Sequence, residues 1–149
     1  MYYNGKEFDG TVIFTGRVEE LFDYKYGALP YRTLKFKLKT YNKSSYQRAA
    51  VVNFTASRRY TRVSEFTKFT CEKQDKTVVM REYPKKCTKN IGRPYYPVPT
   101  AENFERYQKY AEEAKGYKNF ILLGRLAKYE YINMDVAVKK AIELFESID

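Results

Sequence analysis

The residues best suited to chemistry in this sequence are arginines that stand beside tyrosines. Arg32 directly follows a tyrosine, and Tyr60 and Arg62 stand two positions apart, which places that pair on one face of a strand. A guanidinium fork and a phenol hydroxyl can together bind a phosphate group. A surface ion pair of Arg62 with Glu65 or Glu82 is the plainer interpretation of the same spacing.

A glycine–arginine pair stands before the last predicted helix. The apolar run Phe120–Leu123 leads into Gly124 and Arg125, and Asn133-Met134-Asp135 opens an amphipathic helix. The unpaired backbone N–H groups and the positive dipole end of a helix start attract anions. These pieces suit a phosphate-bearing ring cofactor, although ordinary N-capping explains the helix start equally well. No glycine-rich loop accompanies them in this sequence.

The composition removes several kinds of chemistry. Histidine is absent, which excludes imidazole bases, Ser-His-Asp triads and histidine metal sites, and no metal site is predicted. A net charge of +10 with 16 tyrosines favours an anionic partner, such as nucleic acid, an acidic surface or a phosphorylated small molecule. The sequence has neither a signal-peptide core nor a run of about 18 apolar residues. We therefore expect a cytoplasmic protein without a membrane partner.

Alternating and apolar runs predict several strands in the first half of the chain. In Tyr31–Lys39, Arg32 shares one face with the apolar residues, and the lysines occupy the other. Because an unpaired charge on an apolar face is costly, Arg32 should lie at the end of the sheet, facing a pocket or a partner. Successive strands without intervening helices imply an antiparallel sheet. The other predicted strands are a buried one over Gly10–Gly16, then Ala49–Thr55, Tyr60–Phe69 and Lys76–Tyr83.

A helical period replaces the alternation in the second half. Thr100 is the predicted N-cap of one helix, which ends before Gly116, and Asn133 caps the last helix. Between the strands and helices, Pro94–Pro97 should be a stiff extended segment with one tyrosine facing inward and one outward. The sequence thus predicts one α+β domain over residues 1–149, a mainly antiparallel sheet with two helices in the C-terminal half. The expected core positions of these helices are Phe104, Tyr107, Ala111, Ala114, Val138, Ala141, Ile142 and Phe145.

Taken in order, these pieces resemble the C-terminal part of the UDP-galactopyranose mutase family. The resemblance covers nearly the whole chain with similar spacings, and it is the ordered set of motifs that makes it specific. The segments that carry it are Val12–Gly16, Phe22–Leu29, Tyr31–Phe36, Val51–Thr55, Tyr60–Val63, Arg81–Pro84, Tyr95–Val98 and Gly124–Met134.

The resemblance implies a flavoenzyme that interconverts UDP-galactopyranose and UDP-galactofuranose. FAD would be the cofactor, needed in its reduced form although the reaction has no net redox change. In the family mechanism, N5 of the reduced flavin attacks the anomeric carbon while UDP leaves, and the sugar ring then opens and recloses at the smaller size. The implied partners are UDP-galactose and UDP-galactofuranose, and nucleic acid is not among them.

The resemblance also assigns roles to single residues. Gly124 and Arg125 would contact FAD, with Arg125 at its pyrophosphate. The helix start, with Met134, Asp135 and Val136, would lie beneath the flavin edge. Arg62 and Arg32 would be catalytic, because they would stabilise the leaving diphosphate as its charge grows. The implied substrate contacts are Asn53, Arg62, Tyr96, Tyr131 and Asn133.

Two departures from the family pattern bear on these expectations. The N-terminal flavin-binding segment with its GxGxxG motif and a helical insertion are absent from this sequence. Residues 120–149, a strand plus a helix, would pack on that missing part of the same enzyme. We therefore expect these residues alone to be inactive, with an apolar surface that favours homo-oligomers. Asn133 stands where bacterial members usually have aspartate.

Two other interpretations stay open at this stage. One is a stand-alone module that binds an anionic sugar nucleotide or single-stranded nucleic acid, which the charge and the interleaved aromatic residues suggest. The other is a related flavoprotein oxidoreductase, for which Asn133 is the only hint.

Overall fold

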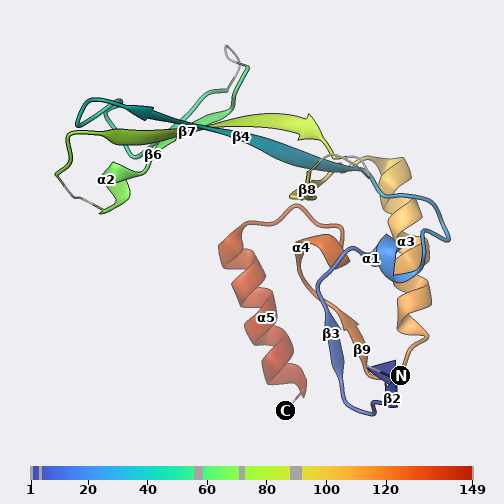
Figure 1. Cartoon of the computed structure of the whole chain (residues 1–149). Helices are drawn as coiled ribbons and strands as arrows, with labels where there is room; N and C mark the ends of the chain where they lie inside the picture. Colours follow the sequence, from blue (N-terminus) through green and yellow to red (C-terminus); the bar gives the residue numbers. More distant parts are fainter. Residues whose placement is uncertain (1, 4, 56–58, 71–72, 88–91, 149) are drawn as a thin grey trace. The chain divides into compact units, whose positions relative to one another are not determined.

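The computed structural model describes residues 2, 3, 5–55, 59–70, 73–87 and 92–148. The chain divides into two compact units, whose elements are labelled in Figure 1. Unit 1 comprises Met1–Tyr31 and Pro94–Asp149, and unit 2 comprises Arg32–Arg93. That residues 1–149 behave as one domain stays a prediction from the sequence.

Unit 2 is built on antiparallel strands that follow one another in the order β5-β6-β7-β4. The predicted antiparallel sheet is thereby confirmed. The predicted strand Tyr60–Phe69 is too long, because the chain leaves the sheet after Glu65 and forms the short helix α2 (Thr67–Thr70). The strands are β4 (Tyr31–Tyr41), β5 (Val51–Asn53), β6 (Arg62–Glu65) and β7 (Thr77–Lys86).

The alternation along β4 gives this sheet two unlike sides. Lys37 lies on the side that carries the buried Val63 and Val79. The other side of β4, which the sequence predicts to be apolar, leaves Phe36 38% and Leu38 63% exposed. The lysine side of the sheet therefore carries the buried apolar residues Val63 and Val79, and the apolar side of β4 is partly open.

A buried carboxylate ties the loop before β5 to the sheet. Glu65 is fully buried, and its two carboxylate oxygens accept hydrogen bonds from the backbone N–H of Tyr46 (2.8 Å) and of Gln47 (2.9 Å). The hydroxyl of Thr77 donates a third, at 2.9 Å. Burial alone would raise the pKa of the Glu65 carboxyl, but these hydrogen bonds outweigh it, and the pKa lies below its ordinary value.

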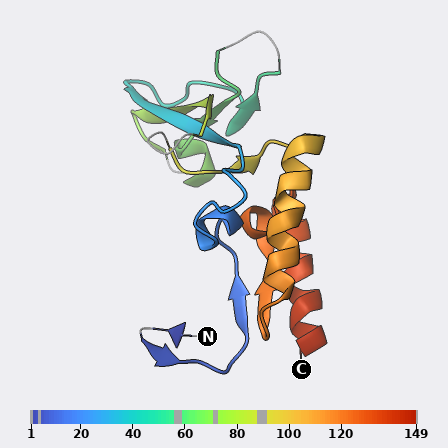
Figure 2. The same cartoon turned by 90° about the vertical axis from the view of Figure 1, so that its right-hand side faces the viewer.

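Unit 1 combines short strands with two long helices. Strands β3 and β9 pair in parallel, with Val12 opposite Phe120, and lie between α3 and α5 (Figure 1). Helix α3 runs along β9 (Figure 2). The predicted α+β class is confirmed. The elements of unit 1 are β1 (Tyr2–Tyr3), β2 (Lys6–Glu7), β3 (Val12–Phe14), α1 (Val18–Leu21), β8 (Tyr96–Pro97), α3 (Ala101–Lys115), β9 (Phe120–Leu122), α4 (Gly124–Ala127) and α5 (Met134–Ile148).

Helix α3 begins as predicted, and its core face agrees with the predicted one in part. The Thr100 hydroxyl accepts a hydrogen bond from the Asn103 N–H at 3.3 Å, which confirms the N-cap. Phe104 is 51% exposed, so its predicted core position is wrong. The predicted core positions Tyr107 and Ala114 are confirmed as buried, and the other buried residues of α3 are Asn103 and Tyr110, each one position before a predicted one.

Buried tyrosine hydroxyls connect the loops of unit 1 to its core. The Tyr110 hydroxyl donates to the Gly27 carbonyl at 2.9 Å. The Tyr129 hydroxyl lies 2.6 Å from the Pro30 carbonyl oxygen and accepts from the Val98 N–H at 3.2 Å. Burial raises the pKa of both phenols, which keeps them protonated as donors. Tyr129 holds this place with a left-handed backbone conformation, φ 49°.

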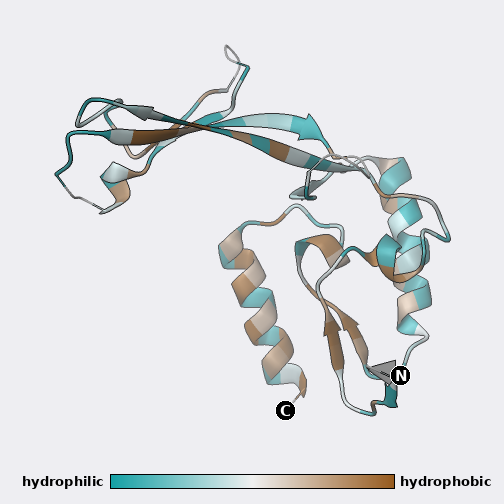
Figure 3. Cartoon of the chain, viewed as in Figure 1, coloured by the Kyte–Doolittle hydropathy of each residue, from teal (hydrophilic) through white to brown (hydrophobic). Residues whose placement is uncertain are grey.

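Helix α5 presents its apolar stripe to solvent in the part of the chain that the structure describes. None of its described residues is buried, so the predicted core stripe is wrong there; Val138 is 59%, Ile142 52% and Phe145 62% exposed. The hydropathy colours in Figure 3 make this stripe visible, together with apolar β3 and β9. The predicted burial of the strand at β3 is also wrong, since Val12 and Phe14 are half-buried and Ile13 is 43% exposed. No described helix is long and apolar enough to span a membrane.

Replacing Glu65→Gln should destabilise the fold at neutral pH. The amide nitrogen would face one of the backbone N–H donors and leave it unsatisfied, a cost of roughly 1–3 kcal/mol. Because the folded pKa of Glu65 is lowered, its stabilisation is present above the ordinary value of 4.5 and is lost as the pH falls through the folded pKa.

Urea unfolding of the parent chain and of Glu65→Gln at a series of acidic pH values measures the difference in their free energies of unfolding. The stability difference should shrink below pH 4.5. The matched control is the exposed Glu105→Gln, for which we expect no measurable change. A difference that stays constant with pH would contradict the assignment.

Candidate functional site

In unit 2, the structure brings together two of the residues singled out by the sequence. The Arg62 Nε donates to the Asn53 side-chain oxygen at 2.9 Å, and one terminal nitrogen of Arg62 lies 3.8 Å from Glu82. The strand register sets these side chains opposite one another, since Arg62 pairs with Asn53 on β5 and with Glu82 on β7. The guanidinium is therefore oriented from both neighbouring strands.

The ion pair considered from the spacing of Arg62 exists with one of the two candidate carboxylates. Glu82 is its partner, whereas the alternative, Glu65, is wrong because that carboxylate binds backbone N–H groups on the other side of the sheet. Arg62 remains 46% exposed while the Glu82 side chain is only 11% exposed. Asn53 and Glu82 therefore hold the Arg62 guanidinium in place, and it remains accessible to solvent and to an anionic ligand.

Arg32 lies near the start of β4, at the end of the sheet, as predicted. It is exposed and pairs in register with Lys86 on β7. Two cations opposite each other repel, which suits a position where an anion can approach. Arg32 falls on the same side of the sheet as Arg62, because both occupy the side opposite to Lys37.

In unit 1, Arg125 connects two segments that carry predicted site residues. Its guanidinium donates to the Ile132 carbonyl at 2.6 Å and to the Tyr95 carbonyl at 3.4 Å. It also lies 5.0 Å from the centre of the Tyr96 ring, a cation–π contact. The rings of Tyr96 and Tyr131 are 5.1 Å apart. Arg125 therefore holds together the two chain segments that carry these tyrosines.

The exposure of the tyrosines only partly follows the prediction. Tyr95 and Tyr96 are both half-buried, so the expected inward and outward pair is wrong. Tyr129 and Tyr131 behave in that way instead, at 5% and 64% exposure. Tyr131 thus presents its ring and hydroxyl to solvent beside Tyr96.

The start of α5 has the open geometry that the sequence predicts. The Asn133 carbonyl accepts from the Ala137 N–H at 3.0 Å, which places Asn133 at the N-cap position. Met134 is 81% exposed and Asp135 is exposed as well, while Val136 is half-buried. The first backbone N–H groups of this 15-residue helix therefore face solvent.

Gly124 adds a second feature that suits a bulky anionic group. Its backbone adopts φ 85°, which disfavours residues with a side chain, and a Cβ placed there would meet nothing within 4 Å. An open approach to the backbone, a helix start and a nearby guanidinium fit one edge of a flavin nucleotide. The donors of Arg125 are directed at peptide carbonyls, so its part in holding a pyrophosphate stays a prediction.

The predicted residues fall into one group in each unit. Unit 2 holds Asn53, Arg62 and Arg32, and unit 1 holds the glycine, arginine, tyrosine and helix-start residues. Glu82 had only the role of an ion-pair candidate in the sequence, and its place opposite Arg62 follows from strand register. Tyr129 was not singled out, although its alternation with Tyr131 was a usable signal.

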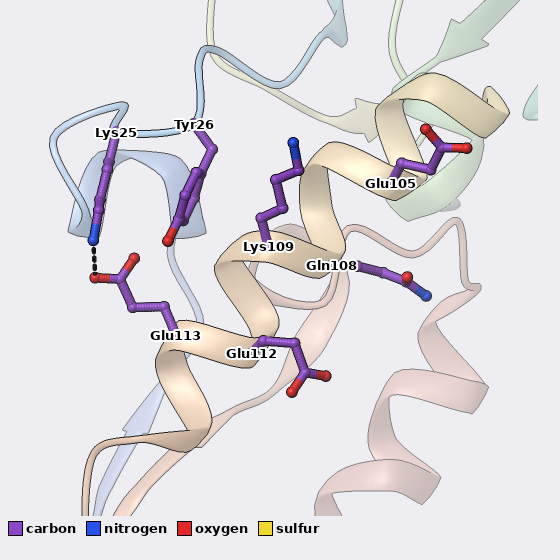
Figure 4. Close-up of a pocket in the computed structure, with 7 residues that line it drawn as sticks. All are labelled: Lys25, Tyr26, Glu105, Gln108, Lys109, Glu112 and Glu113. Atoms are coloured by element: carbon purple, nitrogen blue, oxygen red, sulfur yellow. Dashed lines mark hydrogen bonds and ion pairs between the residues drawn. The ribbon is translucent and has the colours of Figure 1, made fainter.

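A shallow hollow beside α3 contains none of the predicted residues. It is lined by Lys25, Tyr26 and side chains of α3, and the Lys25 ammonium donates to Glu113 at 2.8 Å across it (Figure 4). Its charged groups are already paired or exposed, and it has no group of convergent donors. It is therefore not the candidate site.

Comparison with known proteins gives a consistent result. A family model described as UDP-galactopyranose mutase matches residues 2–131. A dTDP-fucopyranose mutase from Escherichia coli is 38% identical over 136 residues, which are 90% of this chain and 36% of that protein. A UDP-galactopyranose mutase from Mycoplasma genitalium is 35% identical over 148 residues, 96% of this chain and 37% of that protein.

A third relative has a similar identity to this chain and a similar share of its length covered. The probable UDP-galactopyranose mutase from Klebsiella pneumoniae is 35% identical over 134 residues, 89% of this chain and 34% of that protein. The chain therefore spans little more than a third of the length of these curated relatives.

Arg125→Lys should loosen both segments that the guanidinium connects. A lysine ammonium cannot form the same fork to two carbonyls while covering the Tyr96 ring. Hydrogen exchange measured by mass spectrometry should be faster in peptides that contain residues 94–98 and 130–137, and unchanged in β4–β7. The exposed Arg93→Lys is the control. Unaltered exchange in both peptides would show that Arg125 does not hold them.

Proposed function

The chain belongs to the UDP-galactopyranose mutase family, and we propose that it supplies the sugar-nucleotide-binding part of such an enzyme. The substrate would be a nucleoside-diphosphate hexose whose pyranose ring is converted to a furanose, with UDP-galactopyranose as the first candidate. The observation that carries the proposal is the Arg62 guanidinium, oriented by Asn53 and Glu82 and still open to solvent.

The side of the unit 2 sheet that carries Arg62 and Arg32 suits a diphosphate leaving group. The Arg62 guanidinium can bind phosphate oxygens in two-point geometry, and Arg32 adds a second positive charge near the start of β4. Their attraction grows as the glycosidic bond breaks and negative charge collects on the diphosphate. Both arginines would therefore act on the transition state and not only on the bound substrate.

In unit 1, the exposed Tyr131 and the neighbouring Tyr96 would be substrate-binding residues. Asn133 would add an uncharged hydrogen bond near them. Gly124, Arg125 and the start of α5, with Met134, Asp135 and Val136, would line one edge of FAD. A reduced flavin bound there would supply the nucleophile that this histidine-free chain lacks. The dipole of α5 would stabilise negative charge at that edge.

We propose that the rest of the flavin site comes from residues outside these 149. A parallel pair of two strands is rarely stable alone, and parallel sheets are usually covered on both faces. The open β3–β9 pair and the exposed stripe of α5 are surfaces that a flavin-binding part would cover. Alone, the chain would have no turnover, and these surfaces would favour self-association.

The name of one relative motivates a second candidate substrate. The dTDP-fucopyranose mutase is 38% identical to this chain, slightly more than the two UDP-galactopyranose mutases above. A dTDP-linked 6-deoxy sugar would use the same diphosphate contacts at Arg62. A related oxidoreductase remains a further alternative, which conversion of either sugar nucleotide by the complete enzyme would remove.

Titration of the chain with UDP, followed by NMR, tests the diphosphate role. We expect Arg62→Ala to weaken UDP binding about 10- to 100-fold, as for the loss of a charge-assisted hydrogen bond. Uridine, which lacks the diphosphate, should bind equally weakly to both proteins. The exposed Arg93→Ala controls for net charge. Equal UDP affinity of Arg62→Ala and the parent chain would overturn the assignment.

The incomplete flavin site predicts a colourless protein. Mixed with FAD and passed over a gel-filtration column, the chain should retain no stoichiometric flavin, because its described residues offer one edge of the site. Absorbance in the flavin bands measures this. A yellow protein with one FAD per chain would contradict the proposal that other residues complete the site.

A further inference from the structure

The side of the unit 2 sheet opposite to Arg62 carries an array of cations. Lys35, Lys37 and Lys39 alternate along β4 and are exposed. The register sets Arg81 of β7 opposite Lys37, and Lys85 opposite Thr33, on this same side. Neighbouring ammonium groups along β4 are separated by about 6.7 Å of strand, and the two strands by about 4.8 Å. The positive charges thus extend in two dimensions.

Tyrosine rings hold these cations in place. The Lys37 ammonium lies 5.3 Å from the centre of the Tyr83 ring, and that of Lys39 lies 5.1 Å from the Tyr41 ring. Lys43, in the loop after β4, lies 4.7 Å from the Tyr46 ring. The ammonium groups of these three lysines therefore lie near aromatic rings, while the lysines themselves stay exposed.

Arg81 occupies the centre of this array, and its hydrogen-bond partners among the described residues are neutral tyrosine hydroxyls. One terminal nitrogen donates to the hydroxyls of Tyr41, at 3.0 Å, and Tyr46, at 2.8 Å. The guanidinium also lies 5.8 Å from the centre of the Tyr60 ring. The hydrogen bond from Arg81 is the main cause that lowers the pKa of Tyr41. These contacts orient the arginine without neutralising it.

The described strand residues on this side of the sheet include no exposed carboxylate. Among the described residues of β4, β5, β6 and β7 on this side, the only carboxylate is Glu65, which is fully buried. Like charges opposite each other, as at Lys37 and Arg81, destabilise a sheet. An external anionic surface would relieve that repulsion.

We propose that this basic tyrosine face, formed by Lys35, Lys37, Lys39, Lys43, Arg81 and Lys85 with Tyr41, Tyr46, Tyr60 and Tyr83, adsorbs to an anionic lipid surface. A two-dimensional array of cations complements a layer of acidic headgroups, whereas one extended acidic chain would meet only one row. Cations already lie over the tyrosine rings, which disfavours stacking of nucleic-acid bases. The sequence predicts no membrane partner because it lacks a spanning segment, and adsorption through lysines needs none.

Sedimentation with vesicles tests the proposal on the 149-residue chain. Vesicles would contain phosphatidylcholine alone or an equimolar mixture with phosphatidylserine, at low and high salt. We expect binding to the mixed vesicles only, and weaker binding at high salt. The triple variant Lys35→Gln, Lys37→Gln, Lys39→Gln should lower the partition coefficient roughly 100-fold, since each surface cation contributes about fivefold.

The control removes the same charge elsewhere, with the exposed residues changed as Lys6→Gln, Lys109→Gln and Lys118→Gln. It should bind mixed vesicles within a few-fold of the parent chain. Equal losses in both triple variants would mean that net charge alone acts, and would overturn the proposal. So would absence of vesicle binding at low salt, or lysine-dependent binding of an oligothymidylate without vesicle binding. Circular dichroism confirms that each variant is folded.

Discussion

Buried tyrosine hydroxyls must find hydrogen-bond partners, and the organisation of unit 1 depends on this constraint. Tyr110 and Tyr129 reach from the core to the backbone carbonyls of Gly27 and Pro30, so the irregular segment between α1 and β4 is held at two points. Tyr129 also accepts from the Val98 N–H, which anchors the segment that carries Tyr96. An unsatisfied hydroxyl or carbonyl in these positions would cost roughly 1–3 kcal/mol. The candidate site in unit 1 is therefore supported by side-chain-to-backbone bonds rather than by a regular sheet.

The cations on the two sides of the unit 2 sheet have different kinds of partner. On one side, Arg62 has an amide and a carboxylate beside it, so its charge is partly balanced and its direction is fixed. On the other side, Arg81, Lys37 and Lys39 contact tyrosine rings or hydroxyls, which orient positive charge without cancelling it. The first arrangement suits a single diphosphate in a defined pose. The second suits an extended anionic surface with little geometric selectivity.

Packing among the described residues of unit 1 leaves some of its apolar surface exposed. Helix α5 has a regular apolar stripe, yet none of its described residues is buried, and β3 and β9 form a two-stranded parallel sheet in the part of the chain that the structure describes. The hydrophobic effect makes such exposure unfavourable in a stable isolated protein. The curated relatives are almost three times as long as the part that this chain matches. These facts favour a larger assembly in which the start of α5 is enclosed.

Local patterns in the sequence determined most of the elements and the ordered motifs. Alternation predicted β4 and β7, Thr100 and Asn133 predicted two helix starts, and the spacing of arginines and tyrosines pointed to the candidate residues, because strand and helix periods are local properties of the chain. Only the tertiary structure decided which side chains meet. It placed Glu82 rather than Glu65 beside Arg62 through strand register, directed Arg125 to the Ile132 carbonyl, and left Phe104 and the stripe of α5 in solvent. Burial and pairing depend on contacts between distant segments, and a local period gives the face that could be buried but not the partner that covers it.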